Sequence, residues 1–279
     1  MKLPVDQLRK KAMEIRLSVI QSLAAAGSGH LGGSLGLADI FTALYFHELK
    51  HDPNNPGWKE RDRLVLSIGH VAPIFYAALA HAGYFPLSEL KTLRKLGSRL
   101  QGHPATVHEI PGLETSSGSL GQGLSIAVGM ALAAKHDKAN HRVFSIHGDG
   151  ELQEGSIWEA AMAAGNHKLD NIVAIVDRNG VQIDGPTAQV MTIEPLKEKW
   201  EAFNWQVHEC DGNNMQNMLA CFENVKKHHG KPQVIIAHTK MGAGVASIEN
   251  DYRWHGKPPK GDQAEDFISQ VKQSYNENA

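Results

Sequence analysis

The sequence has few cysteines, no excess charge of either sign and no long apolar run. Two cysteines among 279 residues, Cys210 and Cys221, cannot form a disulfide framework and suit a reducing compartment. A formal net charge of -2 leaves no basic field for nucleic acid. No apolar stretch reaches membrane-spanning length, and the first residues lack the apolar centre of a signal peptide. We therefore expect a cytoplasmic protein that binds neither nucleic acid nor membrane.

Apolar runs alternate with helical segments along the chain. Buried strands are predicted at residues 63–67, 143–146, 172–176, 205–208 and 233–238. Helices are predicted at residues 6–26, 35–49 (with Ser34 as N-cap), 73–82, from Ser88 onward, 121–135, 156–168, 215–227 and 262–275. Residues 98–118 and 241–261 are rich in Gly and Pro and predict long loops.

This order of elements predicts one fold class. Continuously apolar strands separated by helices are typical of an α/β fold, in which helices cover both faces of a parallel sheet. No internal repeat or linker divides the chain. We expect residues 1–279 to form a single domain.

Two polar motifs follow neighbouring predicted strands. Asp149 stands in a Gly-Asp-Gly motif after the run at 143–146, and Asn179 follows the run at 172–176. Ligands of parallel sheets bind at the carboxyl ends of strands. A carboxylate and an amide oxygen suit Mg²⁺ or Ca²⁺ rather than zinc. Asp-Gly and Asn-Gly pairs also form ordinary turns. The prediction of a metal site therefore depends on their equivalent positions at the ends of two neighbouring strands.

Four glycine-rich loops each carry a histidine. These histidines are His30, His70, His103 and His255. Glycine lets a backbone approach a ligand closely, and imidazole can bond phosphate or move protons near neutral pH. None of the four has a zinc-ligand partner at the usual spacing. A fifth loop, residues 116–123, opens onto a helix start that would attract an anion.

Together these motifs resemble the transketolase family. The segment from Gly148 to Gly180 is similar to the thiamine diphosphate motif, and the histidine loops match the family's pattern in order. The resemblance covers nearly the whole chain but only the first of three transketolase domains. It implies the N-terminal subunit of a split transketolase of the pentose phosphate pathway. That subunit would transfer a two-carbon ketol unit between sugar phosphates.

The same resemblance implies a partner. The pyrimidine-binding and C-terminal domains would lie on a separate C-terminal subunit, which carries the glutamate needed to activate the cofactor. We expect a heterotetramer of two such chains and two partners, no ketol transfer by the isolated chain, and a large exposed apolar patch on it. The alternative of a shortened piece of a longer enzyme stays open.

The resemblance also implies roles for individual residues. Asp149, Asn179 and the main-chain carbonyl of Val181 would bind the divalent metal of thiamine diphosphate. The remaining cofactor contacts would come from Gly118, Gly150, His30, His70, His255, Leu120 (to the aminopyrimidine), Ile183 (to the thiazolium) and Glu154. His30, His103 and His255 would be catalytic and face the sugar. Glu154 and Glu159 would contact the pyrimidine domain, although both also suit a solvated helix start.

Three positions depart from the family pattern. Ser119 stands where transketolases usually have proline, and Arg178 stands where acidic or asparagine residues are common. The basic residue before the Gly242 loop is either His238 or Lys240. These features bring the sequence nearer to deoxyxylulose-phosphate synthase, while the Gly102-His103-Pro104 loop argues against that relative. Further alternatives are a non-catalytic binding module and a 2-oxo-acid dehydrogenase alpha subunit. The sugar is not fixed.

Overall fold

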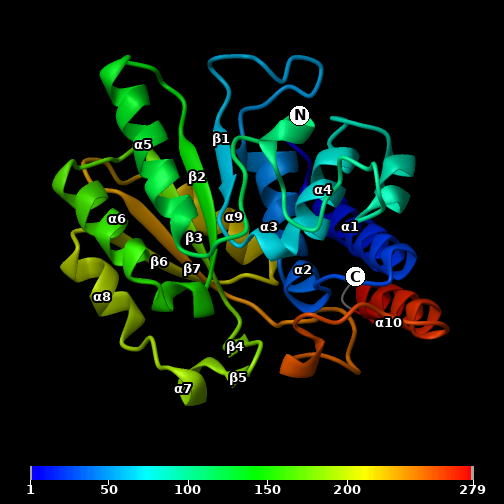
Figure 1. Ribbon diagram of the computed structural model, residues 1–279. Helices are drawn as coiled ribbons and strands as arrows, with labels where there is room; N and C mark the ends of the chain where they lie inside the picture. Colours follow the sequence, from blue (N-terminus) through cyan, green and yellow to red (C-terminus); the bar gives the residue numbers. More distant parts are fainter. Residues whose placement is uncertain (1, 278–279) are drawn as a thin grey trace.

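A five-stranded parallel sheet lies at the centre of the computed structural model, which describes residues 2–277 (Figure 1). The strands are β1 (Arg63–Leu66), β2 (Val143–Gly148), β3 (Ile172–Arg178), β6 (Gln206–Asp211) and β7 (Gln233–His238). They lie in the order β1-β2-β3-β7-β6, and every neighbouring pair is parallel. The predicted α/β fold is confirmed.

Helices cover both faces of the sheet (Figure 1). One face carries α5 (Gln122–His136), α6 (Gly155–Asn166) and α8 (Leu196–Ala202). The other face carries α1 (Val5–Ala26), α3 (Ala38–Ala43), α4 (Ala72–His81) and α9 (Met215–Val225), and α10 (Gln263–Glu277) packs along α1.

The central strands β2, β3 and β7 are mostly apolar because both of their faces are buried, whereas the edge strand β6 is largely polar and half-buried or exposed. In β3, Val173 and Ile175 belong to the core beneath α1, whereas Ile172, Ala174 and Val176 belong to the core beneath α5. Successive strand side chains point to opposite faces, so a sheet covered on both sides needs an apolar residue at each position.

The segment predicted as one helix over residues 35–49 is divided. It consists of α2 (Gly32–Gly36), α3 and a π-helical turn at Leu44–Glu48. Ser34 is not an N-cap, since it lies inside α2 and its hydroxyl donates to the His30 carbonyl at 2.8 Å. A Cβ on Gly36 would lie 2.8 Å from the Lys240 carbonyl oxygen. The glycine therefore allows the loop after β7 to approach α2 closely.

Two other regions differ from the sequence prediction. The helix expected from Ser88 is a 3-10 segment, Leu87–Thr92. Between β3 and β6 lie a hairpin of β4 (Val181–Gln182) and β5 (Gly185–Pro186), α7 (Thr187–Val190) and α8, none of which was predicted. Shorter 3-10 turns lie at Gly69–Val71, Thr106–His108, Gly150–Gln153 and Tyr252–Trp254.

Candidate functional site

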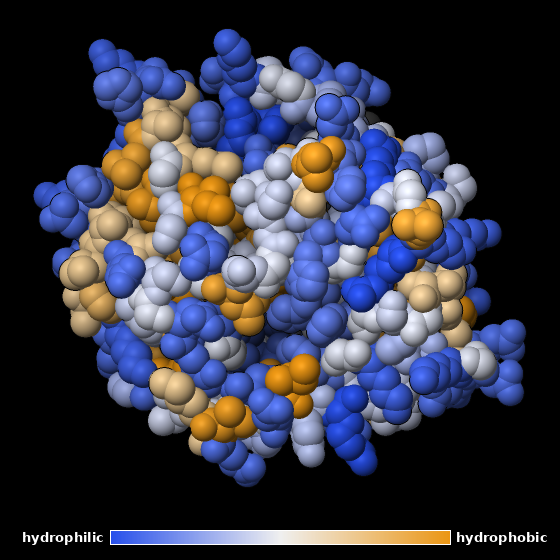
Figure 2. Space-filling view, in the orientation of Figure 1, coloured by the Kyte–Doolittle hydropathy of each residue, from blue (hydrophilic) through white to orange (hydrophobic). Residues whose placement is uncertain are grey.

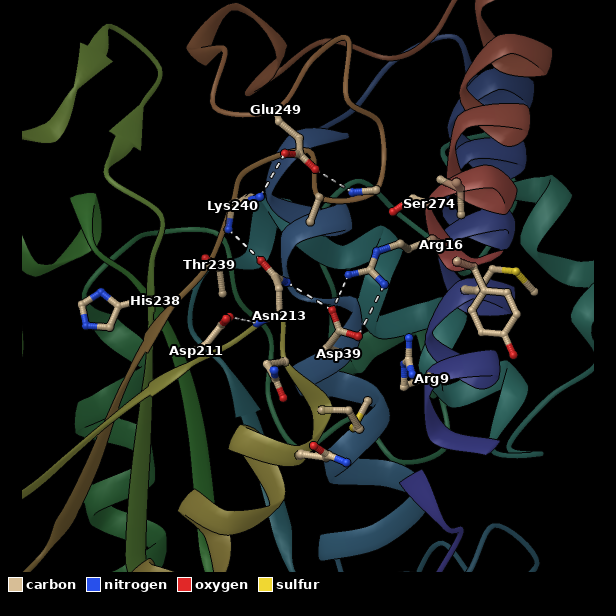
Figure 3. Close-up of a pocket in the computed structure, with 18 of the residues that line it drawn as sticks. Arg9, Arg16, Asp39, Asp211, Asn213, His238, Thr239, Lys240, Glu249 and Ser274 are labelled. Atoms are coloured by element: carbon tan, nitrogen blue, oxygen red, sulfur yellow. Dashed lines mark hydrogen bonds and ion pairs between the residues drawn. The ribbon is translucent and has the colours of Figure 1, made fainter. Parts of the chain in front are cut away.

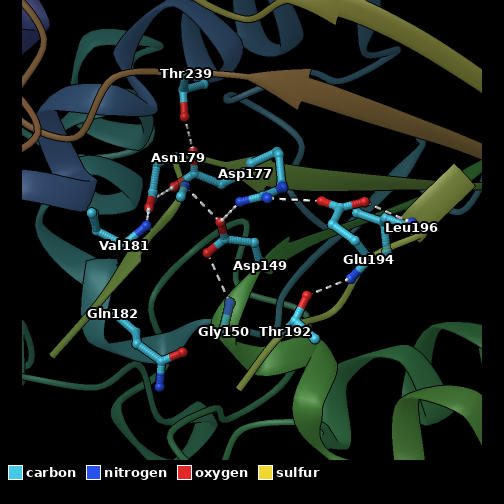
Figure 4. A network of polar contacts seen from close by, with 12 residues as sticks. Asp149, Gly150, Asp177, Asn179, Val181, Gln182, Thr192, Glu194, Leu196 and Thr239 are labelled. Carbon is cyan, nitrogen blue, oxygen red and sulfur yellow. Dashed lines mark hydrogen bonds and ion pairs between the residues drawn. The ribbon is translucent and has the colours of Figure 1, made fainter. Parts of the chain in front are cut away.

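Asp149 and Asn179 lie close together because they follow adjacent strands. Gly148 of β2 pairs with Asp177 of β3 in register, and the Asp149 amide donates to the Asp177 carbonyl at 3.2 Å. Figure 4 shows the side chains of Asp149 and Asn179 near each other and near Val181. The two strand ends therefore meet at one point of the sheet edge, as the sequence predicts.

Asp149 is buried and held by three hydrogen bonds. Its Oδ2 accepts from the Gly180 amide at 2.7 Å and from the Arg178 guanidinium at 2.8 Å. Within the described residues, its Oδ1 accepts from the Gly150 amide alone, at 2.8 Å. Burial raises the pKa of Asp149, and the Gly180 amide and Arg178 oppose that rise. Since each carboxylate oxygen has two lone pairs, Oδ1 keeps one for a further partner.

Two contacts fix the orientation of the Asn179 amide. Its Nδ2 donates to Asp177 Oδ2 at 3.0 Å, and its Oδ1 accepts from the Val181 amide at 3.0 Å. Asp177 is buried and also accepts the Thr239 hydroxyl. Burial raises the pKa of Asp177 to about 7. Because the nitrogen end is engaged by Asp177, the oxygen end of Asn179 retains a lone pair as a hard donor.

This donor set fits a hard divalent cation. Carboxylate, amide and main-chain carbonyl oxygens are the ligands that Mg²⁺ and Ca²⁺ prefer. Across residues 2–277, no group of three or more His, Cys, Asp and Glu side chains is arranged to hold a metal ion. A site built from one carboxylate, one amide and a carbonyl is consistent with that finding.

A buried carboxylate, Glu151, ties three loops of the site together. Its Oε1 accepts the Ser67 hydroxyl and the Gly121 amide, the latter at 2.7 Å, and its Oε2 accepts the Gly148 amide at 3.2 Å. These donors follow β1, precede α5 and end β2. No sequence pattern distinguishes this residue, because a glutamate two positions after Asp149 looks like ordinary helix-start charge.

Three of the four loop histidines form one cluster. The ring centroids of His30 and His70 lie 4.9 Å apart, those of His70 and His255 5.2 Å apart, and those of His30 and His255 5.7 Å apart. His103 adjoins the same loops, since a Cβ on Gly118 would lie 3.6 Å from its ring. The glycine loops therefore converge, as the family resemblance implies.

The clustered histidines favour the neutral form. Burial, followed by the neighbouring histidines, lowers the pKa of His70 to about 3. Burial, then His255, His103 and Arg94, lowers the pKa of His30 to about 4. Burial also lowers the pKa of His255, and burial with Arg94 lowers that of His103. Near neutral pH each ring can therefore both donate and accept a hydrogen bond.

Several buried polar atoms around the cluster have no hydrogen-bond partner in the described chain. They are Nδ1 of His30, Nδ1 of His255 and the Ser117 hydroxyl. A buried polar atom without a partner costs free energy, so native structures rarely leave several together unless a ligand engages them. The cluster thus fits a polar ligand bound between these loops.

The other predicted residues lie on loops that follow the strands and on α6. A Cβ on Gly69 would lie 2.7 Å from the Gly118 amide nitrogen, so these two loop backbones touch. Gly150 begins the turn after Asp149, and Leu120 is half-buried before α5. Ile183 is 61% exposed. The carboxylates of Glu154 and Glu159 are exposed at the start of α6 and along it.

Arg94 is a second residue that no sequence pattern distinguishes. Its guanidinium lies against the backbone of Gly102, where an added Cβ would be 2.2 Å from Nη1. Its Cδ lies near Gly29, where an added Cβ would be 3.6 Å away. Arg94 has a positive φ of 58°. A bulky residue in that region is uncommon and often marks a functional position. The Arg94 guanidinium places a positive charge beside His30 and His103.

A cavity of about 710 Å³ lies elsewhere, between α1, α10 and the ends of β6 and β7 (Figure 3). None of the residues predicted to bind metal or cofactor or to be catalytic lines it, although His238 and Lys240, the two candidates for the basic residue before the Gly242 loop, both do. Its polar groups are bonded mainly to one another: Arg16 to Asp39, Asn213 to Asp39 at 3.2 Å, and Lys240 to Glu249 at 3.4 Å. Figure 3 shows this network across the cavity. It is separate from the histidine cluster.

Apolar side chains are exposed near the site. Figure 2 shows apolar residues gathered over α5 and α6, where Leu132 and Met162 are exposed. Ile183, Val190 and Met191 are also exposed, in the segment that follows Asn179. Single exposed apolar residues are normal, whereas neighbouring ones mark interaction surfaces. Among the described helices, none is long and apolar enough to cross a membrane.

Comparison with known proteins defines the class. Residues 8–278 match the family described as "Transketolase, thiamine diphosphate binding domain". The 6-deoxy-6-sulfo-D-fructose transketolase subunit SqwG of a Clostridium species is 45% identical over 248 residues, covering 89% of this chain and 90% of that protein. One of the subunits of the apulose-4-phosphate transketolase of Actinobacillus succinogenes is 43% identical over 272 residues, covering 97% of this chain and 98% of that protein.

A solved structure gives the same result. The transketolase of Campylobacter jejuni superposes with a TM-score of 0.90 at 36% identity, covering 99% of this chain and 43% of that one. This chain thus spans less than half of that transketolase. Fold, site and family match together define a thiamine-diphosphate-binding domain.

The chain belongs to the transketolase family and is one subunit of a thiamine-diphosphate-dependent transferase.

Proposed function

We propose that this chain is the diphosphate-binding subunit of a two-chain transketolase, active only with a C-terminal partner subunit. The observation that carries the proposal is the convergence of two hard oxygen donors and four histidines at one sheet edge. The family match favours this function over a deoxyxylulose-phosphate synthase, a 2-oxo-acid dehydrogenase alpha subunit or a binding module.

The residues at the sheet edge fit the diphosphate end of the cofactor and its metal. Asp149, Asn179 and the carbonyl of Val181 would hold Mg²⁺ or Ca²⁺. Gly118, Gly150, His70 and His255 would bind the diphosphate, with backbone amides supplying donors. Leu120 and Ile183 would contact the two rings. When bound, thiamine diphosphate supplies the electron sink that cleavage beside a ketose carbonyl requires.

The histidines would handle the protons of the sugar. His30, His103 and His255 are neutral at pH 7 because burial lowers the pKa of each. A neutral imidazole can orient a sugar hydroxyl through one nitrogen and take or return its proton through that same contact. The unpartnered Nδ1 atoms of His30 and His255 leave those rings free to do so.

Arg94 supports a sugar substrate with an anionic end. By their names, the two related subunits described above act on a sulfonated and a phosphorylated sugar. Arg94 forms no ion pair with a described acidic residue and lies beside His30 and His103. We expect Arg94→Gln to raise KM for a ketose phosphate about tenfold and to leave kcat within about threefold. A fall in kcat as large as the rise in KM would contradict this role.

The partner subunit would cover the exposed apolar surface beside the cofactor. The chain matches less than half of a single-chain transketolase but nearly all of the proteins named as separate subunits. In the proposed complex, a second chain would supply the remaining domains. The exposed residues Ile183, Val190 and Met191, with Glu154 and Glu159, would contact the pyrimidine-binding domain. Two chains and two partners would form a heterotetramer.

Reconstitution tests this proposal. The purified chain is assayed for ketol transfer alone and with a chain carrying the pyrimidine-binding and C-terminal domains, and the complex is weighed by light scattering. We expect activity only in the mixture, reaching its maximum at equal molar amounts, and a mass of two plus two chains. Robust turnover by the chain alone would overturn the requirement for a partner.

A further inference from the structure

Arg178 is bonded to Asp149, the proposed metal ligand, through Oδ2. One guanidinium nitrogen donates to Asp149 Oδ2 at 2.8 Å, and another donates to Glu194 Oε1 at 2.8 Å. The Arg178 side chain is 18% exposed and that of Asp149 is 2% exposed, so the pair is largely removed from solvent. The Asp149 oxygen that keeps a free lone pair is Oδ1, on which Arg178 does not act.

Glu194 is fixed from the opposite side. Its Oε2 accepts the Leu196 amide at the start of α8 at 2.8 Å, and its own amide donates to the Thr192 hydroxyl at 3.3 Å. Arg178 therefore connects the carboxylate of the metal site to the beginning of α8. The 51% exposure of the Glu194 side chain leaves this end of the connection open to water.

The positive charge of Arg178 opposes a cation at Asp149, and Glu194 reduces that opposition through its ion pair with Arg178. A guanidinium bonded to a metal-binding carboxylate withdraws electron density and repels the ion, which weakens binding. A carboxylate bonded to that guanidinium offsets part of its charge.

We propose that Arg178 sets the cation affinity of this site, and that Glu194 tunes it by acting through Arg178. Arg178 holds Asp149 with one oxygen presented outward and keeps the affinity for a free divalent cation low. The negative diphosphate then supplies the charge that favours cation binding, so metal and diphosphate bind together. This inference rests on the proposed function, because it assumes that Asp149 is a metal ligand.

The test is the dissociation constant for Mn²⁺, measured by electron paramagnetic resonance on the purified full chain with and without thiamine diphosphate. We expect Arg178→Gln to bind Mn²⁺ about tenfold more tightly and Glu194→Gln to bind about threefold more weakly. In the double variant, Glu194→Gln adds no further change, because the carboxylate acts only through the guanidinium. Arg178→Lys keeps the charge and the wild-type affinity within about threefold.

Lys135→Gln is the matched control. It removes one positive charge near Asp170, at the amino-terminal edge of the sheet, and is expected to leave the Mn²⁺ affinity unchanged. Weaker Mn²⁺ binding in both Arg178→Gln and Glu194→Gln would show that the two residues only hold the site in shape, and it would overturn the inference. If Arg178→Gln does not fold, the Glu194→Gln variant alone tests the inference. An unchanged Mn²⁺ affinity in Glu194→Gln overturns the inference as well. Absence of Mn²⁺ binding by the wild-type chain with thiamine diphosphate would instead refute the metal site of the proposed function.

Discussion

At the scale of single residues, the sequence locates the polar groups of the candidate site better than the residues that hold them in place. Asp149 and Asn179 follow strands, and the loop histidines follow glycines, so local patterns reveal them. Glu151 and Arg94 act across the fold, on partners more than 20 positions away or on the other side of a loop. No local pattern marks such contacts, since they depend on which loops the sheet brings together.

Glu151 offers a test at this scale. We expect Glu151→Gln to lower the free energy of unfolding by about 1–3 kcal/mol, because an amide nitrogen would face donors now bonded to a carboxylate. Chemical denaturation measures the loss. Glu154→Gln changes the same residue type at an exposed position three residues later, and should stay within about 0.5 kcal/mol of wild type. An equal loss in both variants would contradict the role given to Glu151.

The histidine cluster predicts a pH dependence of stability. The pKa of His70 is lowered to about 3 in the folded chain, below its ordinary value of 6.5. The unfolded chain therefore takes up this proton first, so the contribution to stability is present above pH 6.5 and is lost as the pH falls toward 3. We expect the melting temperature of His70→Asn to fall less steeply than that of wild type from pH 7 to pH 4. The exposed His136→Asn is the control, and its slope should match wild type.

At the scale of elements, apolar periodicity locates the sheet but not the irregular segments. The five strands and the long helices lie within a few residues of their predicted bounds. The sequence does not predict β4, β5, α7 and α8 between β3 and β6, because these elements are short and mostly polar. The division of residues 32–48 follows from the close approach of the loop after β7, a contact between segments about 200 positions apart.

Gly36 tests that explanation of the divided helix. A Cβ there would lie 2.8 Å from the Lys240 carbonyl oxygen, so we expect Gly36→Ala to destabilise the fold by about 1–3 kcal/mol. Gly129 in α5 has open space around a built Cβ, and Gly129→Ala should stabilise by about 0.5–1 kcal/mol. Thermal melts compare the two. A Gly36→Ala variant as stable as Gly129→Ala would show that the loop does not constrain α2.

At the scale of the whole molecule, one sheet edge gathers the polar groups of the candidate site. The parallel strands bring Asp149 and Asn179, the proposed metal donors, together, and the glycine loops bring the histidines beside them. The exposed apolar side chains of the segment after Asn179 border the same edge. The sequence predicted this convergence, since parallel strands end at a common edge. It did not predict which residues form the exposed surface, because exposure depends on the tertiary packing of short elements.

The most direct measurement is calorimetric titration of thiamine diphosphate into the purified chain with Mg²⁺, for wild type and for Asp149→Asn. The oxygen donors at the strand ends are expected to make binding depend on the metal. We predict that Asp149→Asn, or removal of the metal with a chelator, weakens binding by about 100-fold while circular dichroism shows an intact fold. Affinity that survives both changes within a few-fold would contradict the assignment of these two strand ends as the site of the cofactor.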